Sequence, residues 1–383
     1  MDEATAKVIL ELYVASDIAE KFGISKRTAR DWRAVATARL EGVSDKKPTA
    51  RERNDAQHWK SQFLGLEKAH ARLETLHEQV AGLAATPLSP PDWLLPQASE
   101  PGEAVIGLLL TDVHCGEVVK SEEIVGLGAY DVPTCRRRLR RYFAAACEVG
   151  LRWGSDCQIK GAVLFLGGDL VSGDIHEELR LTNELTSTEQ VVAVAEEITS
   201  GINHLADTYG HVYVVSVGGN HGRTTTKPMY KMYARTNYDT LVARIIKNEF
   251  RNYRSVSGDI VFDIPNSMDA LVPVLGKTIF INHGNNLGTG GGMGFAGPGL
   301  PIIRGAKRVE LQQFYAKRTF DFMLSGHFHT TLNHPQGLAN GSVIGYSEYG
   351  NGLRCALEPP QQWLFLVHKK WGLRERMPIV LEG

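Results

Sequence analysis

Five short segments of this sequence contain side chains that can bind metal ions. In chain order they are Asp112-Val113-His114, Gly168-Asp169, Gly219-Asn220-His221, Asn282-His283 and Gly326-His327-Phe328-His329. Carboxylate and imidazole groups are the ligands that suit Mn, Fe, Zn or Ni ions in proteins. The residue types therefore predict metal chemistry, provided that the fold brings the five segments together.

An apolar run precedes each of these segments. The runs cover residues 105–110, 162–166, 212–217, 278–281 and 320–324. Runs of this length, bounded by Gly, Asn or Asp, are typical of buried strands. Parallel strands deliver their carboxyl ends to one edge of a sheet, where α/β folds build their sites. We therefore expect the five segments to converge there.

The number of candidate ligands is too large for one tetrahedral ion, which takes four. Besides His221, the candidate ligands in these segments are two Asp, one Asn (Asn220) and four His. A set of this size suits two ions about 3.5–4 Å apart that share a carboxylate, an arrangement used for in-line attack on phosphorus.

The order of the five motifs resembles that of the calcineurin-like metallophosphoesterases, namely D-x-H, G-D, G-N-H, H and G-H-x-H, over residues 103–381. The nearest analogue is the repair-exonuclease branch of that family. The resemblance implies an α/β fold with two packed mixed sheets flanked by helices. It also implies two divalent metal ions, with Mn²⁺ as the first candidate and Fe, Zn or Ni as alternatives.

The resemblance also assigns a role to each candidate residue. Three ligands would bind each ion: Asp112, His114 and His329 the first, and Asn220, His283 and His327 the second. Asp169 would bridge both ions. His221 would donate a proton to the leaving oxygen while a metal-bridging hydroxide attacks the phosphorus. Cys115 is expected to be a packing residue.

Two departures from the family pattern concern the same site. The family usually follows G-N-H with Asp or Glu, which orients the His, whereas Gly222 and Arg223 follow here. Either another carboxylate orients His221, or Arg223 has a different role near the phosphate. The second motif also lacks the Arg of protein serine/threonine phosphatases, which argues against that branch. Impaired catalysis with metals still bound is the alternative to an active enzyme.

Three further residues are predicted to contact substrate: Arg223, His176 and Arg180. The segment 172–183, which contains the last two, would form a wall beside the metals, or else be an ordinary helix start. The Gly-rich stretch 284–299 follows His283 and is either a substrate-flanking loop or a surface excursion.

Residues 1–48 are predicted to form a helix-turn-helix domain. Ile18, Phe22, Ile24 and Trp32 fall where its two helices must pack, and Ser25 suits the N-cap of the second helix. The exposed face of that helix would present side chains that contact phosphates and base edges, namely Lys26, Arg27, Thr28 and Arg30. The pattern resembles helix-turn-helix DNA-binding modules, with a protein-docking unit as the alternative.

The remaining segments complete the predicted organisation. Residues 49–85 are predicted to form a long helix, residues 86–102 a Pro-rich linker and residues 103–383 the catalytic domain. Within the long helix, positions 59–83 carry apolar or small residues at alternating steps of three and four, which predicts a coiled coil. That helix would make a homodimer, or else pack on the catalytic domain of its own chain.

Composition sets the remaining expectations. The chain has 383 residues, 43% hydrophobic and 22% charged, with a net charge of −1. Residues 26–60 are an exception, with ten Lys/Arg against five Asp/Glu. Five cysteines without a C-x-x-C pair predict reduced thiols. Neither a signal peptide nor a membrane span is expected, and the protein is predicted to be cytoplasmic.

Three functions remain open from the sequence. The first is a metal-dependent phosphodiesterase, a nuclease brought to DNA by its N-terminal module. The second is a phosphomonoesterase or nucleotide phosphodiesterase that the DNA-binding module localises or regulates. The third is a DNA-binding regulator whose phosphoesterase domain is weakly active.

Overall fold

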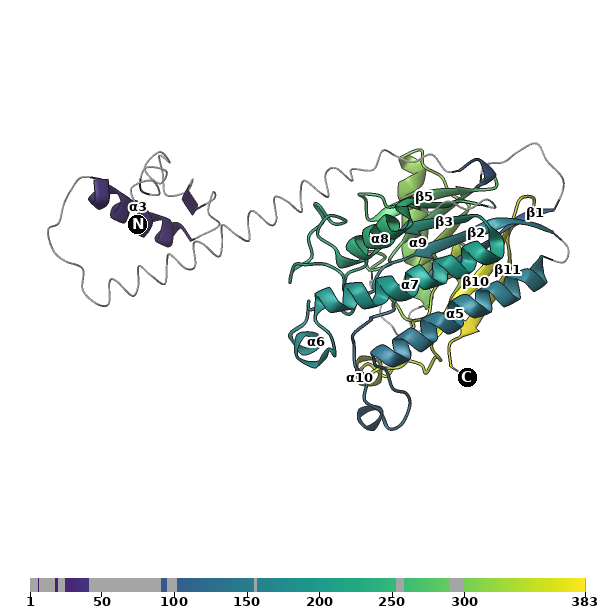
Figure 1. The fold of residues 1–383 in the computed structure, drawn as a ribbon, viewed down its shortest axis with the longest axis horizontal. Helices are drawn as coiled ribbons and strands as arrows, with labels where there is room; N and C mark the ends of the chain where they lie inside the picture. The colour runs from purple at the N-terminus through teal and green to yellow at the C-terminus, as the bar shows by residue number, and fades with distance from the viewer. Residues whose placement is uncertain are drawn as a thin grey trace. The chain divides into compact units, whose positions relative to one another are not determined.

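The computed structural model describes residues 6, 18–19, 25–40, 91–94, 102–154, 157–252, 258–288 and 299–382. The chain divides into two compact units, Met1–Ala84 and Ala85–Gly383. Figure 1 labels many of the helices and strands of the two units. The long helix predicted for residues 49–85, and most of the linker, lie outside the described residues.

In the first unit the structure describes one long helix, α3 (Lys26–Leu40). Ser25 caps it as predicted, since its Oγ accepts a hydrogen bond from the Thr28 N–H at 3.1 Å. Ile18 is fully buried in a small cluster against which Trp32 packs, also as predicted. Phe22 and Ile24 lie outside the described residues, so the helix-turn-helix and its DNA contacts stay predictions.

The second unit contains a six-stranded sheet with the order β11-β10-β1-β2-β3-β4. Its strands are β1 (Glu103–Leu110), β2 (Gln158–Leu166), β3 (Val212–Ser216), β4 (Ile260–Asp263), β10 (Gln361–His368) and β11 (Gly372–Val380). β1 to β4 are parallel to one another, while β10 is antiparallel to β1 and to β11. Three of the predicted strands, β1, β2 and β3, therefore lie side by side.

A five-stranded sheet with the order β5-β6-β7-β9-β8 contains the other two predicted strands. Its strands are β5 (Asp269–Val274), β6 (Lys277–Asn282), β7 (Phe322–Ser325), β8 (Leu332–His334) and β9 (Gly337–Ala339). β6 and β7 are parallel, as expected. The last predicted run begins too early: Phe320 precedes β7 and stacks on Phe280 instead.

The two sheets pack face to face. Alternate residues of β1 point to opposite sides of its sheet and belong to two different cores. Val105 and Leu109 join the core between the sheets, with Phe165, Ile281 and Leu324 from other strands. Ile106, Leu108 and Leu110 point the other way, into the core under the helices. The α/β fold with two mixed sheets, which the family resemblance implied, is confirmed.

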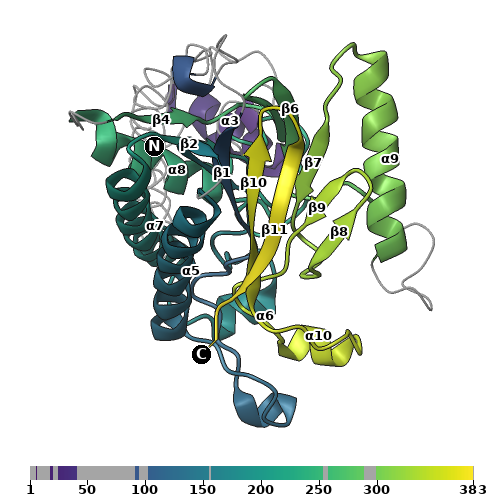
Figure 2. The same cartoon turned by 90° about the vertical axis from the view of Figure 1, so that its right-hand side faces the viewer.

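Helices cover the outer face of each sheet. The helices α5 (Val132–Trp153), α7 (Ser187–Tyr209) and α8 (Tyr238–Glu249) all contact the six-stranded sheet, and α7 lies between the other two and contacts both. On the other side, α9 (Gly299–Tyr315) lies against the five-stranded sheet (Figure 2). Its Ala306 and Val309 pack with Phe280 of β6 and Met323 of β7. The short helices are α6 (Glu177–Thr182), α10 (Glu348–Gly352), η1 (Asp92–Leu94), η2 (Ser121–Ile124) and η3 (Phe250–Asn252).

Two smaller expectations can be compared with the structure. All five cysteines are free thiols, and Cys115 is buried in the core as a packing residue. In the part of the chain that the structure describes, no helix combines the length and the apolar character that a membrane crossing needs.

Candidate metal centre

The five predicted segments meet where the carboxyl ends of both sheets come together. β1, β2 and β3 end at Leu110, Leu166 and Ser216, and β6 and β7 end at Asn282 and Ser325. Backbone hydrogen bonds join the loops beyond them: the Val113 N–H donates to the Asp169 carbonyl at 2.8 Å. The His327 N–H donates to the Asp112 carboxylate at 3.0 Å, which joins the two sheets. The site therefore lies between two sheets rather than at the edge of one.

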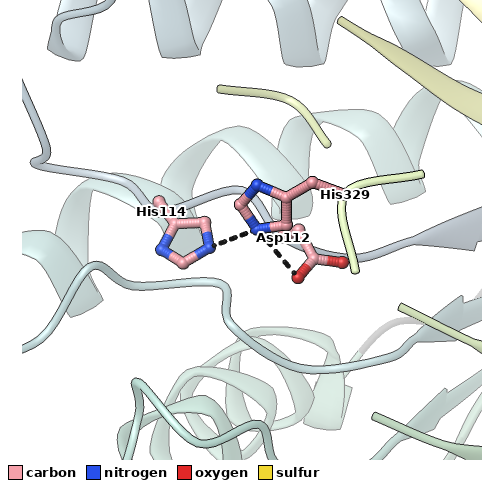
Figure 3. Close-up of side chains that lie close together, drawn as sticks. All are labelled: Asp112, His114 and His329. Carbon is pink, nitrogen blue, oxygen red and sulfur yellow. Dashed lines mark hydrogen bonds and ion pairs between the residues drawn. The ribbon is translucent and has the colours of Figure 1, made fainter. Parts of the chain in front are cut away.

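Asp112, His114 and His329, the predicted ligands of the first ion, lie together (Figure 3). The His329 Nε2 is 3.1 Å from the His114 Nε2 and 3.4 Å from the Asp112 Oδ1. Two nitrogens bound to one ion at ~2.1 Å and nearly at right angles to each other would lie ~3 Å apart. The spacing of these three side chains thus fits a single metal ion.

Asp169, His283 and His327 form a second group that could hold an ion. The His283 Nε2 is 2.8 Å from the Asp169 Oδ2. The His283 Nδ1 is 2.9 Å from the Gly167 carbonyl, which can only accept, so the hydrogen sits on Nδ1. That bond turns Nε2 toward Asp169, as backbone carbonyls commonly do for metal-binding imidazoles.

Asn220, the remaining predicted ligand, has a side-chain oxygen with no hydrogen-bond partner. This Oδ1 atom is buried, and no described group donates to it. A buried acceptor without a partner costs about 1–3 kcal/mol, so native structures usually satisfy it. A cation beside Asn220 would supply the missing interaction.

The charges of the site favour cation binding. Burial opposes ionisation of Asp112 and Asp169, but the neighbouring imidazoles still hold the pKa of both carboxyls below its usual range. Burial lowers the pKa of His327 to about 4 and that of His114 well below its ordinary value. Burial also disfavours the charged form of His283, yet the Asp169 carboxylate raises its pKa to about 10. Burial likewise disfavours the charged form of His329, but the hydrogen bond and charge of Asp112 raise its pKa, so His283 and His329 must lose a proton before they bind a metal.

The backbone of the predicted ligands is strained in a way that is common at functional sites. Asp112, His114, Asp169, His327 and His329 have φ angles of 53°, 50°, 53°, 72° and 49°. They make up half of the ten non-glycine residues with positive φ in the described ranges. Such residues rarely adopt this conformation, and it persists where the surrounding structure enforces it.

His221, the predicted proton donor, is held by a backbone carbonyl. Its Nδ1 is 2.9 Å from the Ser172 carbonyl, and its own N–H donates to the Asp169 Oδ1 at 2.7 Å. The His221 ring is thus oriented by a backbone carbonyl rather than by another carboxylate, and a role of Arg223 near the phosphate stays a prediction. His221 also forms a third group with His114 and Asp169 that could hold an ion.

Gly222, where the family usually has a carboxylate, has no room for a side chain. A Cβ atom there would lie 2.5 Å from the Asn237 Oδ1 and 2.7 Å from the Asp239 Oδ2. Asp239 belongs to α8 and is fully buried. The space next to the G-N-H motif is therefore filled by a carboxylate from a different element.

Asp239 holds the backbone of two loops that carry predicted metal ligands. Its Oδ2 accepts hydrogen bonds from the Asp169 N–H at 2.9 Å and the Gly219 N–H at 2.8 Å. Its Oδ1 accepts a third from the Leu170 N–H at 2.9 Å. Because Asp239 ties the β2 and β3 loops together, it fixes the distance between Asp169 and Asn220.

Sequence reasoning missed Asp239, and it also missed two other residues near the site. The Glu117 Oε2 lies 3.6 Å from the His114 Nδ1, and burial raises the pKa of Glu117 to about 7. Tyr233 is only 8% exposed, and its hydroxyl makes no hydrogen bond to the described residues. None of the three belongs to a motif, so only their positions in the fold reveal them.

The three predicted substrate contacts lie in different surroundings. The His176 ring is 5.9 Å from that of His221 and faces the site edge-on. Arg223 donates to the carbonyls of Asn220, Thr225 and Thr226, so it organises its own loop. Arg180 is on the surface, 65% exposed, with its guanidinium 3.7 Å from Glu177.

A cavity of about 400 Å³ lies elsewhere, beside Trp93, Lys160 and His211. Lys160 is near the start of β2, whereas the predicted metal ligands follow the carboxyl ends of strands. The cavity is thus separate from the metal centre, which the convergence of the ligands defines.

Comparisons with known proteins add little to this geometry. No protein-family model matches the sequence, and no curated protein matches it. Among solved structures, the phosphopantetheinyl hydrolase from Mycobacterium tuberculosis matches with 12% identity and a TM-score of 0.26. That match covers 74% of this chain and 98% of the other. Such a TM-score supports no conclusion about this chain, whose fold and candidate metal groups rest on its own geometry.

Proposed function

We propose that this protein is a phosphodiesterase of the calcineurin-like metallophosphoesterase type that uses two divalent metal ions, with Mn²⁺ as the first candidate, and acts on DNA. The observation that supports it most is the gathering of predicted ligands in two neighbouring groups, Asp112 with His114 and His329, and Asp169 with His283 and His327. Two ions held there would supply a nucleophile at neutral pH and neutralise charge on the phosphoryl oxygens.

The side chains of the site would have different roles in the reaction. Asp112 and Asp169, both buried and ionised, would hold the cations. The Nδ1–H of His221 donates to the Ser172 carbonyl, which leaves Nε2 as the atom that can move a proton. In its doubly protonated form, His221 would give the Nε2 proton to the leaving oxygen as the P–O bond breaks.

A nucleic-acid substrate is the preferred interpretation for two reasons. The exposed side chains at the start of α3 are cationic, with Lys26, Arg27 and Arg30 all facing solvent. A unit of this kind would hold phosphate backbones, and pairing it with a phosphoester-cleaving site favours a nuclease. Replacing these three residues by Ala should weaken DNA binding and flatten its salt dependence, without changing hydrolysis of a small diester.

Two substitutions test the catalytic assignment. His221→Ala should abolish turnover but leave the bound Mn²⁺ nearly unchanged, whereas Asp169→Ala should lower both. His204→Ala, on the exposed face of α7, is the matched control and should change neither. Loss of metal in His221→Ala would instead make His221 a ligand, in line with the group that it forms with His114 and Asp169.

A substrate panel in Mn²⁺ separates the candidate functions. Shortened products from linear or circular DNA, single- or double-stranded, would support the nuclease. Turnover limited to p-nitrophenyl phosphate or a mononucleotide would contradict it and favour a phosphomonoesterase or nucleotide phosphodiesterase. No hydrolysis of any phosphoester would contradict the enzymatic proposal.

A further inference from the structure

The loop of residues 222–237 begins directly after His221 and returns to α8. Its two ends are joined by the Tyr238 N–H, which donates to the Gly222 carbonyl at 2.6 Å. The Thr224 N–H donates to the Thr236 carbonyl at 3.0 Å. Between these ends the loop contains four Lys or Arg residues and no Asp or Glu. We call it the cationic loop.

Arg223 fixes the position of the cationic loop relative to the metal centre. Its guanidinium donates to the carbonyls of Thr225 and Thr226 in the loop, and to the carbonyl of Asn220, a predicted ligand, at 2.9 Å. Since Arg223 is occupied in this way, three cations remain directed to solvent. They are Lys227, Lys231 and Arg235, all of which are exposed.

Exposed apolar side chains alternate with these cations. Tyr230 is 81% exposed, and Met229 and Met232 are 47% and 53% exposed. Lys227 and Lys231 stand on either side of Tyr230 in the sequence. Cations next to an exposed aromatic ring are what proteins use to hold unpaired nucleic acid, because every base can stack and every nucleotide carries a phosphate.

Tyr233 of the cationic loop is turned inward. Tyr233 is 8% exposed, and its buried hydroxyl makes no hydrogen bond to the described residues. Asp169 and Asp239 are close enough for their charges, after burial, to raise the pKa of Tyr233, and Asn285 lies beside it. The Tyr233 hydroxyl is therefore a buried polar group whose surroundings include Asn285 and the carboxylates of Asp169 and Asp239.

Carboxylates also lie near the metal centre. The Glu117 Oε2 is 3.6 Å from the His114 Nδ1, and the charges of Glu348 and Glu178 act on Glu117. A polyanion is attracted by the cations of the cationic loop and repelled by such carboxylates.

We propose that the cationic loop binds an unpaired stretch of nucleic acid next to the phosphodiester that is cleaved. Tyr230 stacks on a base, Lys227 and Lys231 contact the flanking phosphates, and the Tyr233 hydroxyl donates to an oxygen of the scissile phosphate. The inference rests on the proposed phosphodiesterase function and specifies its substrate as single-stranded.

The test compares a fluorescein-labelled oligonucleotide of about 15 nucleotides with bis(p-nitrophenyl) phosphate, both in Mn²⁺. Tyr230→Ala should lower the ratio of their kcat/KM values, oligonucleotide over small diester, by roughly 5- to 100-fold because the stacked base is no longer held. The double variant Lys227→Ala/Lys231→Ala should lower it at least about 10-fold. It should also reduce the salt slope of binding by about 0.7 for each phosphate that a lysine no longer neutralises. Tyr233→Phe should lower kcat on both substrates about 10-fold or more.

A matched control uses Lys370 and Trp371, a cation and a 64% exposed aromatic ring at the turn between β10 and β11. This turn is at the opposite edge of the sheet, because His368 pairs with Ala104 at the start of β1. Lys370→Ala and Trp371→Ala should leave the ratio unchanged. A single strand should also be cleaved at least about 10-fold faster than a blunt duplex of the same sequence.

The outcomes separate this inference from the proposed function. If the oligonucleotide is cleaved but the cationic-loop variants behave like the Lys370 and Trp371 variants, the loop inference is wrong and the nuclease stands. Cleavage of duplex as fast as single strand also overturns it. If only the small diester is cleaved, the nuclease proposal fails. Fluorescence anisotropy of the oligonucleotide with His221→Ala then decides the loop inference by itself: tight binding that disappears in Lys227→Ala/Lys231→Ala supports it, and absence of binding rejects it.

Discussion

Asp239→Asn is the substitution that separates stability from metal binding most clearly. The fully buried Asp239 carboxylate accepts three backbone N–H groups, two of them on one oxygen. An Asn of the same shape would keep its oxygen where two N–H groups point. Its NH₂ would then face the Leu170 N–H, donor against donor. The β2 loop would shift away from the β3 loop, and the predicted ligands Asp169 and Asn220 would lose their fixed separation.

The effect on stability depends on pH. Burial, and then the charge of Asp169, raise the pKa of Asp239 to about 6 from an ordinary value of 3.8. A carboxyl with a raised pKa stabilises the folded state fully below the unfolded pKa, and this stabilisation is lost as the pH rises through 6. Two pKa units correspond to about 3 kcal/mol. In metal-free protein, raising the pH from 4 to 7 should therefore lower the free energy of unfolding of the native chain by about 3 kcal/mol relative to that of Asp239→Asn.

The effect on metal binding should be separate from this stability change. Groups that orient metal ligands typically contribute 10- to 100-fold to affinity, so Asp239→Asn should weaken Mn²⁺ binding at pH 7.5 by about that factor. Urea unfolding in EDTA and calorimetric Mn²⁺ titration measure the two effects. Asp263→Asn is the control, since Asp263 is a half-buried carboxylate whose partner is Tyr213. Unchanged Mn²⁺ affinity in Asp239→Asn, or a stability difference that does not vary with pH, would refute the reasoning.

Two further predictions concern neighbouring residues. Burial disfavours the protonated form of His283, but the Asp169 carboxylate raises its pKa to about 10. A metal ion that binds His283 must therefore displace a proton from it. Mn²⁺ affinity should rise about tenfold per pH unit between 6.5 and 8.5, and calorimetry in two buffers should detect the released proton; a flat profile contradicts this. Gly222→Asp should lower the free energy of unfolding by about 3 kcal/mol or more, because its Cβ would lie 2.7 Å from the Asp239 Oδ2. Gly352→Asp, whose Cβ meets nothing within 4 Å, should cost under about 1 kcal/mol in the same urea titration, and equal losses would contradict the steric argument.

The strands and the candidate ligands could be predicted because their signals are local in the sequence. Each apolar run is followed within a few residues by its own Asp, Asn or His, as in β1 and Asp112. The runs end at a common place because β1 is parallel to β2, and β6 is parallel to β7. Their division between two sheets is not a local property, and only the resemblance to a known family implied it.

The partners of the ligands could not be predicted, for a physical reason. His221 is oriented by a carbonyl of residue 172, and every residue has a carbonyl, so the sequence contains no signal for it. Asp239 is the second residue of α8 and lies two positions after the N-cap, Asn237. Asp and Asn are common at such helix starts, so neither residue stands out in the sequence. The steric hint was Gly222: a glycine where a carboxylate is expected indicates that another group occupies the space.

The central claim is that side chains from both sheets bind two ions that share Asp169. The most direct measurement is anomalous X-ray diffraction from crystals of the protein loaded with Mn²⁺. We expect two anomalous peaks on either side of the Asp169 carboxylate, one next to His114 and His329 and the other next to His283 and His327. A single peak, or peaks away from these side chains, would contradict the claim.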